Sequence, residues 1–494
     1  MSHGGGGFPP LEFIEKHFGM KLFNLASWTE ALGDWGVSRG LFLSIIFVSE
    51  YFVLGHLIPS LPVFTINWLV GTAPIWLPVA LIYGFWKVWL WYIQSLYLSG
   101  RNPVLLEMKM PREITKSPRA MEIALANFWL NSGETTFIHR GWKGQVRPFF
   151  SFEIASFGGE IHFYIWCWKA YVHTVQEALY GMYPEVELIE VEDYASKFQL
   201  DPKHHNVFAT DWRLESARGE GRVYGKGKFR IEDMYALKTY VEFELDKDPK
   251  EELKVDPMSS PMEFMSSLHP YEQVWTQFIV RRCGKYGVLL VHERDDEWKH
   301  SMQDEIELIR AQSSSLPGNS KFEKFEDLAD LAEEKNVMRF PNPSPRHKQM
   351  MESIDRNMTK LPFEFMGRAI YIATDHEING ATATHMRWMW KPMGNSAYGI
   401  HLRPRRWHNY FDYPWQDVAD IRFRRHGRHA IDAFRRRSAF HTPWITPTDV
   451  MTTESLATIW RPLSSTVTAP GLRRIPAKKA EPPANLPKMA AVHH

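Results

Sequence analysis

The chain has 494 residues, of which 58 are Lys or Arg and 57 are Asp or Glu, so its formal net charge is only +1. This balance excludes a uniformly basic nucleic-acid coat protein and an acidic tail protein, and any electrostatic partner must bind a local patch. Two isolated cysteines, Cys167 and Cys283, predict neither a zinc site nor a disulfide framework. The length predicts two or three domains.

The N-terminal segment, residues 1–37, contains apolar side chains at helical spacing between Leu11 and Trp35. This pattern predicts an amphipathic helix that lies on a membrane surface or packs against the chain's own domain. The first ten residues lack the basic region and apolar run of a cleavable signal peptide.

Residues 38–98 are predicted to form a transmembrane hairpin. The stretch 66–86 holds no charged residue and is long enough to cross a hydrocarbon core of ~30 Å as a helix. The stretch 40–58 is also apolar, but Glu50 lies near its middle, so a complete span is left open there. Basic residues flank the hairpin and are absent from its loop, which predicts an anchor in the cytoplasmic (inner) membrane with both chain ends in the cytoplasm.

Residues 101–200 are predicted to form a ferredoxin-like domain. Apolar residues alternate on both sides of Gly158 and Gly159, which predicts a hairpin, and helical spacing follows it. The order βαββαβ is that of a split βαβ unit. The predicted elements are strand 104–110, a helix from 117, strands 150–155 and 161–165, helix 172–182 and strand 186–191.

Residues 201–400 are predicted to form a second, looser α+β domain, interrupted by a polar insertion near 312–345. Its predicted elements are strand 240–245, helix 261–268, strands 274–280 and 363–373, and helix 381–390. The expected fold class is therefore α+β: an N-terminal transmembrane helical hairpin, one or two ferredoxin-like domains and an extended C-terminal tail.

The sequence holds no phosphate-binding G-x-x-x-x-G-K-[ST] loop, no H-E-x-x-H zinc motif and no G-x-S-x-G nucleophile elbow. We therefore predict a protein that is not an enzyme and that needs no cofactor or metal.

An arginine- and aromatic-rich region, residues 401–450, is the strongest candidate binding patch. Arginines interleaved with aromatic rings suit phosphate contact and base stacking, which predicts DNA as a candidate partner. The same composition suits anionic lipid headgroups, or arginines that pair with acids on a partner subunit, and these three alternatives stay open. The candidate residues are Arg403, Arg405, Arg406, Arg422, Arg424, Arg425, Arg428, Arg435, Arg436 and Arg437.

Three stretches together resemble a known family: VLLEMKMPREITKSPRAMEIALA at 104–126, YPEVELIEVEDY at 183–194, and the segment 451–487 that ends AKKAEPPANLP. They are similar to the N-terminal, membrane-anchored half of type IV secretion and conjugation ATPases. In that family such a tail leads into a motor domain with Walker motifs. The resemblance implies a membrane-docking module of a DNA or protein translocation machine, with the motor on another chain.

The C-terminal segment, residues 451–494, is predicted to begin with a short capped helix at 453–461 and to continue as a proline-rich strap. Proline favours an extended chain and reduces the entropy lost on docking. We therefore expect this segment to dock a separate motor ATPase, and a homo-oligomer is a further expected assembly. The residues expected to make the contact are Arg473, Arg474, Lys478, Lys479, Pro482 and Pro483.

Two rival functions remain at this stage. One is a membrane scaffold that binds lipid or cell-envelope proteins. The other is a membrane enzyme whose site is assembled from scattered polar residues that no motif reveals.

Overall fold

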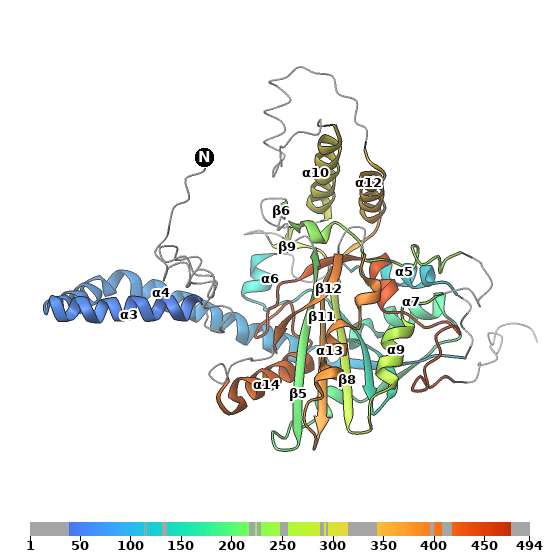
Figure 1. Cartoon of the computed structure of the whole chain (residues 1–494), viewed down its shortest axis with the longest axis horizontal. Coiled ribbons are helices and arrows are strands. Elements are labelled where there is room, and N and C mark those ends of the chain that lie inside the picture. Colours follow the sequence, from blue (N-terminus) through green and yellow to red (C-terminus); the bar gives the residue numbers. More distant parts are fainter. Residues whose placement is uncertain are drawn as a thin grey trace, which may run out of the picture. The chain divides into compact units, whose positions relative to one another are not determined.

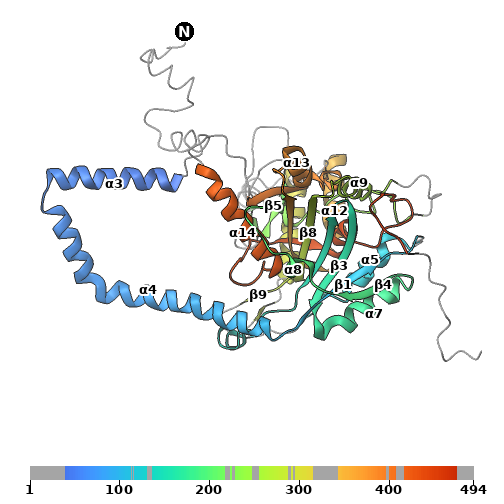
Figure 2. The same cartoon turned by 90° about the horizontal axis from the view of Figure 1, so that it is seen from below.

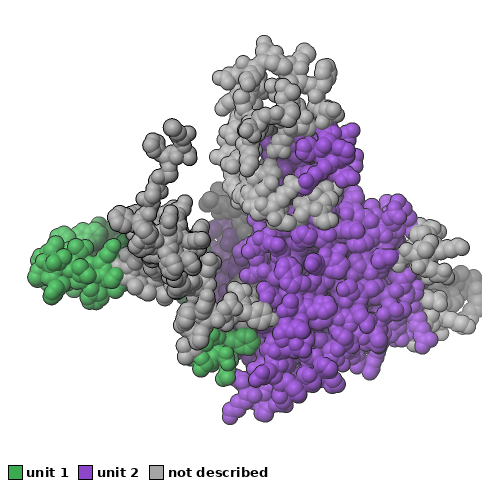
Figure 3. Space-filling model, viewed as in Figure 1, with its two compact units in different colours: residues 1–89, 408–425 green, residues 90–407, 426–494 purple. Residues whose placement is uncertain are grey.

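A computed structural model describes residues 39–112, 114, 116–130, 136–216, 223–224, 229–247, 255–286, 291–292, 295–314, 343–395, 400–407 and 417–475. The predicted N-terminal amphipathic segment lies outside these residues, as do most of the polar insertion and the chain after Ile475. The chain divides into two compact units, residues 1–89 with 408–425 and residues 90–407 with 426–494 (Figure 3).

The first unit contains two consecutive helices, α3 (Arg39–Leu57) and most of α4 (Leu61–Ser99). Among the described helices, α4 is the one that is long and apolar enough to cross a membrane. Its side chains before Leu90 are mostly exposed apolar groups, as expected of a helix whose solvent is lipid. The helix bends along its length (Figure 2) and contains Pro74 and Pro78, the usual cause of such a bend.

The end of α4 belongs to the second unit, where it packs into the core. Ile93 and Gln94 are buried, and Thr442 Oγ1 donates a hydrogen bond to Gln94 Oε1 over 3.2 Å. Gly144 has a φ of +63°, and a side chain at this position would collide with the carbonyl group of Ile93. Glycine is therefore required where the chain passes this close to the helix.

The described residues of the second unit form a nine-stranded sheet in which all paired strands are antiparallel (Figure 1). Eight strands follow the order β12-β5-β11-β8-β2-β3-β1-β4, and β13 pairs with the start of β11. Their bounds are β1 (Pro103–Lys109), β2 (Phe150–Phe157), β3 (Glu160–Trp168), β4 (Glu187–Val191), β5 (His205–Ser216), β8 (Glu272–Arg282), β11 (Pro362–Thr374), β12 (Ile400–Trp407) and β13 (Asp449–Thr452).

The two halves of the sheet repeat one arrangement. In each half the strand that comes first in the sequence lies second from the outer edge, and the last strand forms that edge. The second strands of the halves, β2 and β8, pair in the middle, so the sheet is continuous. The α-helices among the described residues of the second unit are α5 (Pro118–Ala126), α6 (Phe137–Gly141), α7 (Val172–Met182), α8 (Tyr194–Lys197), α9 (Ser259–Ser266), α10 (Asp295–Ser314), α12 (Pro345–Met358), α13 (Gly380–Trp388), α14 (Ile421–Arg435, which begins in the first unit) and α15 (Thr453–Ile459).

The predicted strands and helices between 103 and 191 are all present, within a few residues of their expected bounds. In the second half, the strand predicted at 240–245 is wrong, because these residues form turns and Glu244 has a φ of +56°. The strand in the equivalent place is β5, which lies about 30 residues earlier in the chain. The outer strand β12 was not predicted.

Both faces of the sheet are covered. On one face, α5, α7 and α15 pack over the apolar residues of the first half, with Phe128 edge-on to Phe150 and Phe152. On the other face, α14 and the chain that follows it pack over Trp166, Trp275 and their neighbours. A sheet buried on both faces must hold its polar side chains inside the protein.

Candidate functional site

The ten arginines predicted as one binding patch occupy different environments. They lie on β12, on α14 and on the turn that follows α14. The side chain of Arg406 lies outside the described part of the structure. The other nine separate into buried, paired and exposed groups, so the sequence region is not a single binding surface.

Arg437 is fully buried and structural. Its guanidinium donates to Glu153 Oε1 (Nε, 3.0 Å) and to Asp193 Oδ2 (Nη1, 2.5 Å). Tyr194 Oη donates to the second oxygen of Glu153 over 2.7 Å. The Arg437 guanidinium lowers the pKa of Asp193, against the effect of its burial. This cluster holds the end of α14 against β2 and the start of α8, and it is unavailable to DNA or lipid.

Four further arginines are engaged within the protein. Arg435 donates to the carbonyl oxygens of Ala195 and Phe198. Arg436 is half exposed and pairs with Asp432 on the previous turn of α14, at 2.9 Å. Arg403 and Arg405 on β12 both pair with Glu215 on the adjacent strand β5.

The remaining described arginines lie on the exposed face of α14. Arg422, Arg424, Arg425 and Arg428 are exposed, whereas Gly427, Ala430, Ile431 and Phe434 on the opposite face are buried. The helix is therefore amphipathic, with one cationic side and one side packed in the core. This helix face gathers four exposed arginines of the predicted patch, whereas the exposed Arg405 and Arg436 are each paired with an acid.

The C-terminal segment expected to dock a partner is buried through Leu463 and stays packed against the second unit as far as Ile475. All seven residues of α15 are buried. The ring of Trp460 packs against Phe152 at 4.8 Å between centroids, and Arg461 pairs with Asp256 at 2.6 Å. The predicted side-chain cap is absent, because Thr452 Oγ1 bonds to Asn357 on α12 instead.

Arg474 is likewise committed within the protein. Its guanidinium donates to carbonyl oxygens of the loop that precedes it and of the chain just after β1, among them Val467 O at 2.9 Å and Pro111 O at 3.2 Å. Arg473 is exposed and pairs with Glu160 at 2.9 Å. Lys478, Lys479, Pro482 and Pro483 lie outside the described residues.

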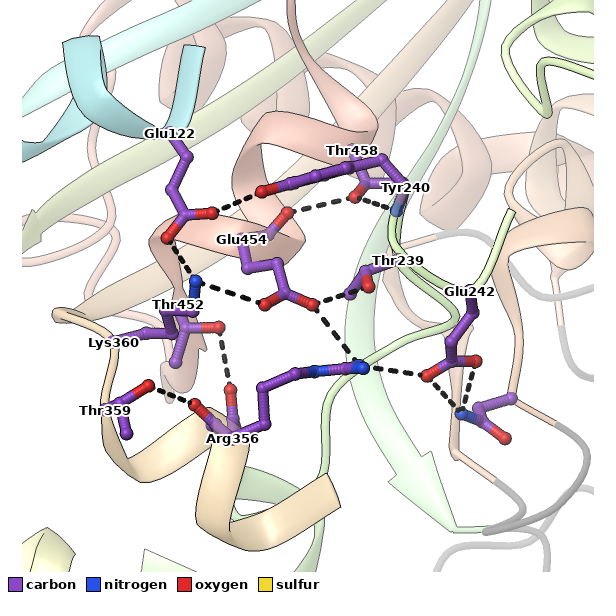
Figure 4. A network of polar contacts seen from close by, with 12 residues as sticks. Glu122, Thr239, Tyr240, Glu242, Arg356, Thr359, Lys360, Thr452, Glu454 and Thr458 are labelled. Carbon is purple, nitrogen blue, oxygen red and sulfur yellow. Dashed lines mark hydrogen bonds and ion pairs between the residues drawn. The ribbon is translucent and has the colours of Figure 1, made fainter. Parts of the chain in front are cut away.

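A buried polar network centres on Glu454, a residue that the sequence analysis did not single out (Figure 4). Its carboxylate accepts a hydrogen bond from Thr239 Oγ1 (2.6 Å) and faces Arg356 (3.3 Å) and Lys360 (3.4 Å). Lys360 also pairs with Glu122 on α5 at 2.7 Å. The network ties α15 to α5 and to the end of α12, so it holds three distant parts of the chain together.

A second buried cluster contains two carboxylates, Asp449 and Asp233, and joins β13 to the strand β5. Asp449 accepts from Arg213 (2.7 Å) and Arg230 (2.5 Å), and Asp233 accepts the backbone N–H groups of Arg230 and Val450. Burial and the nearby Asp449 carboxylate raise the pKa of Asp233 to about 6. Both clusters resemble structural ion pairs, since every acid has basic or backbone donors from neighbouring elements.

Neither cysteine offers a reactive thiol. Both are buried, and burial followed by the nearby Glu190 raises the pKa of Cys167 to about 12. A thiol with such a pKa is almost wholly protonated at neutral pH and is a poor nucleophile.

The described residues contain no group of three or more His, Cys, Asp or Glu side chains placed to hold a metal ion. An open depression of about 740 Å³ lies beside the C-terminal segment. Arg112, Glu263 and Arg474 are its charged lining residues, and the donors of Arg474 are already used by backbone carbonyls.

Comparison of the chain with models of protein families, with curated proteins and with solved structures finds no match. A functional assignment must therefore come from the residues and geometry of this chain.

Proposed function

We propose that the protein is a non-enzymatic, membrane-anchored subunit of a type IV secretion-like or conjugation-like apparatus, in which it docks a separate motor ATPase. The structure of α4 is the observation that supports the membrane anchor. This helix exposes apolar side chains along its first two thirds and buries Ile93 and Gln94 at its end. A helix of this kind joins an apolar solvent to a folded body.

We further infer that each half of the sheet is a ferredoxin-like unit and that α3 and α4 form a transmembrane hairpin. The order of elements and their positions in the sheet are the same in both halves, which supports a repeated βαββαβ unit. The short connection between α3 and α4, residues 58–60, supports a hairpin. The translocation role and the cargo, DNA or protein, rest on the sequence resemblance.

Cysteine labelling tests the membrane anchor. Because Cys167 and Cys283 are buried, a single introduced cysteine reports on one position. In inside-out membrane vesicles, we expect a membrane-impermeant maleimide to modify Lys203→Cys on the body. It should modify Ile75→Cys on α4 only after detergent is added. Equal modification of both without detergent would show that α4 does not cross the bilayer.

The loop position Ser60→Cys tests the hairpin. We expect modification from the outer side of the membrane and protection in inside-out vesicles, because the loop between two spans lies opposite the body. Modification in inside-out vesicles would place this loop in the cytoplasm and exclude the hairpin.

Truncation tests the docking of the motor. Because the segment through Ile475 is packed within the second unit, the informative variant ends after Ile475 and retains α15. We expect the full chain, and not this variant, to retain a Walker-motif ATPase encoded by a neighbouring gene. Equal recovery with both would exclude residues 476–494 as the dock, and no recovery with either would contradict the motor-docking function.

A further inference from the structure

The first turns of α14 carry an exposed cationic and apolar surface. Ile421 is 63% exposed, and Arg424 and Arg425 are exposed as well. Residues three and four apart on a helix share one face, so both arginines lie beside Ile421. We call Ile421, Arg424 and Arg425 the α14 tip.

The helix start is fixed by its own residues. Asp417 accepts the backbone N–H groups of Arg422 and Phe423, each over 2.8 Å. This carboxylate is therefore used to cap the first turn of the helix. The α14 tip itself contains no acidic side chain, and among the described residues no hydrogen bond or ion pair engages the guanidinium groups of Arg424 and Arg425.

We propose that the α14 tip binds the anionic headgroups of the membrane in which α4 is anchored. This inference rests on the proposed membrane anchor. The tip belongs to the same compact unit as α3 and the apolar part of α4, residues 1–89 with 408–425. Cations near the cytoplasmic surface of a bilayer are attracted by its negative potential.

The apolar member of the tip favours lipid over nucleic acid. An exposed isoleucine beside two arginines has the composition of a helix that lies in a membrane interface, with the apolar group in the acyl boundary and the cations at the phosphates. Nucleic-acid backbones offer phosphates for the arginines and no apolar layer for Ile421. Arg422 and Arg428 are further exposed cations on the same helix, whereas Arg403 and Arg405 are paired with Glu215 and Arg437 is buried.

A fluorescent label at the tip tests the proposal. The full-length protein carrying Ile421→Cys, labelled with an environment-sensitive dye, is reconstituted into vesicles of neutral phosphatidylcholine and into vesicles with about 30% phosphatidylglycerol. We expect a blue shift and increased emission only with the anionic lipid. Added NaCl at about 0.5 M should reverse the change, because salt screens exposed charges.

Two double variants test whether the response depends on the two arginines of the α14 tip or only on the total positive charge of the protein. In Arg424→Ala/Arg425→Ala, we expect the lipid-dependent change to fall by roughly half or more. The matched control, Arg119→Ala/Lys203→Ala, removes the same charge at exposed positions on the body and should retain the change. An equal response to neutral vesicles, an unchanged response in the tip variant, or an equal loss in the control would overturn the proposal.

Single-stranded DNA provides the competing outcome. If the label responds to an oligonucleotide in detergent micelles and not to anionic vesicles, the α14 tip is a nucleic-acid contact and the lipid proposal is wrong. The Ile75→Cys experiment distinguishes a failure of the headgroup proposal from a failure of the membrane anchor. Protection of Ile75→Cys with no lipid response at position 421 retains the membrane anchor and removes only the headgroup contact.

Discussion

At the scale of single residues, Arg436 and Arg437 are adjacent in the sequence but differ in how far the fold buries their side chains. The side chain of Arg437 is 0% exposed and that of Arg436 is 50% exposed. Arg437 neutralises Glu153, which has no exposure of its own. Arg436 pairs with Asp432 at the surface, where water and salt weaken the attraction.

We expect Arg437→Met to lower the free energy of unfolding by roughly 3–5 kcal/mol, because Glu153 would remain buried without its partner. The matched change Arg436→Met should cost at most about 0.5 kcal/mol, the value of an exposed i,i+4 pair. Urea unfolding of the detergent-solubilised full chain measures both. Similar costs for the two variants would contradict the structural role of Arg437.

The buried imidazole of His441 predicts a dependence of stability on pH. Burial and then the nearby Arg281, Arg436 and Arg368 lower the pKa of His441 to about 3. In the unfolded chain the pKa is about 6.5. The unfolded state therefore gains a proton first, and folding stability is lost as the pH falls from 6.5 toward 3.

Replacing this residue by phenylalanine should remove that loss. His441 packs against Phe149 at 5.5 Å between ring centroids, so an aromatic ring of similar shape preserves the packing. Between pH 7 and pH 5, we expect the native chain to lose about 2 kcal/mol more stability than His441→Phe. Parallel pH dependences of the two proteins would mean that His441 is protonated in the folded state.

At the scale of elements, α15 and the chain after it complete the core of the first half of the sheet. Trp460 packs against Phe152 on β2 and Phe163 on β3. Isolated bridges connect Ile161 to Leu472 and Pro111 to Ile475. The last described residues thus lie against β3 and the chain just after β1, more than 300 residues earlier in the sequence.

Truncation is expected to separate two functions of the C-terminal segment. A chain that ends after Thr452 loses α15, Trp460 and Arg461, so we expect it to aggregate or to lack a cooperative unfolding transition. A chain that ends after Ile475 keeps every described contact of the segment and should unfold at the same temperature as the full chain. A folded, soluble product after truncation at Thr452 would contradict the packing role of α15.

In the second half, the strands predicted at 274–280 and 363–373 are present as β8 and β11, and the failure at 240–245 shows what the sequence pattern lacked. The sequence YVEFEL alternates like a strand, but alternation gives no information about whether a neighbouring strand is present to pair with it. In β5, Asp211 lies within an apolar run, and the sequence offers no reason to bury it. Its partner is Arg368 on β11, at 3.2 Å, which is adjacent only in the folded sheet.

At the scale of the molecule, the pairing of β2 with β8 makes the two predicted domains, 101–200 and 201–400, one continuous sheet. On the face covered by α14, one cluster of buried side chains contains residues from both halves, among them Trp166 on β3 and Ile370 on β11. Two domains with a small interface would unfold separately, whereas one shared core favours a single transition.

Substitutions in the two halves test this cooperativity. Val175 on α7 and Met386 on α13 are each fully buried, one in each half. We expect Val175→Ala and Met386→Ala to lower the midpoint of the same transition, at a cost of roughly 1–4 kcal/mol each. Calorimetry of the full chain in detergent checks this. Two transitions, each responding to one substitution, would show that the halves fold independently.

The sequence by itself determined the local elements whose signal is contained within a short window. The apolar run of α4, the alternation around Gly158 and the helical spacing of α7 all predicted their elements because hydrophobic periodicity and turn residues are local properties. The α+β class followed from these elements.

Tertiary structure decided which arginines are available and where the C-terminal segment lies. Glu153, which lies between the apolar residues Phe152 and Ile154 in the sequence, is buried because α14 covers its face of the sheet, and its charge is met by Arg437 from 284 residues away. Such pairings depend on which distant elements share a low-dielectric interior, and this is information that no single window of the sequence contains.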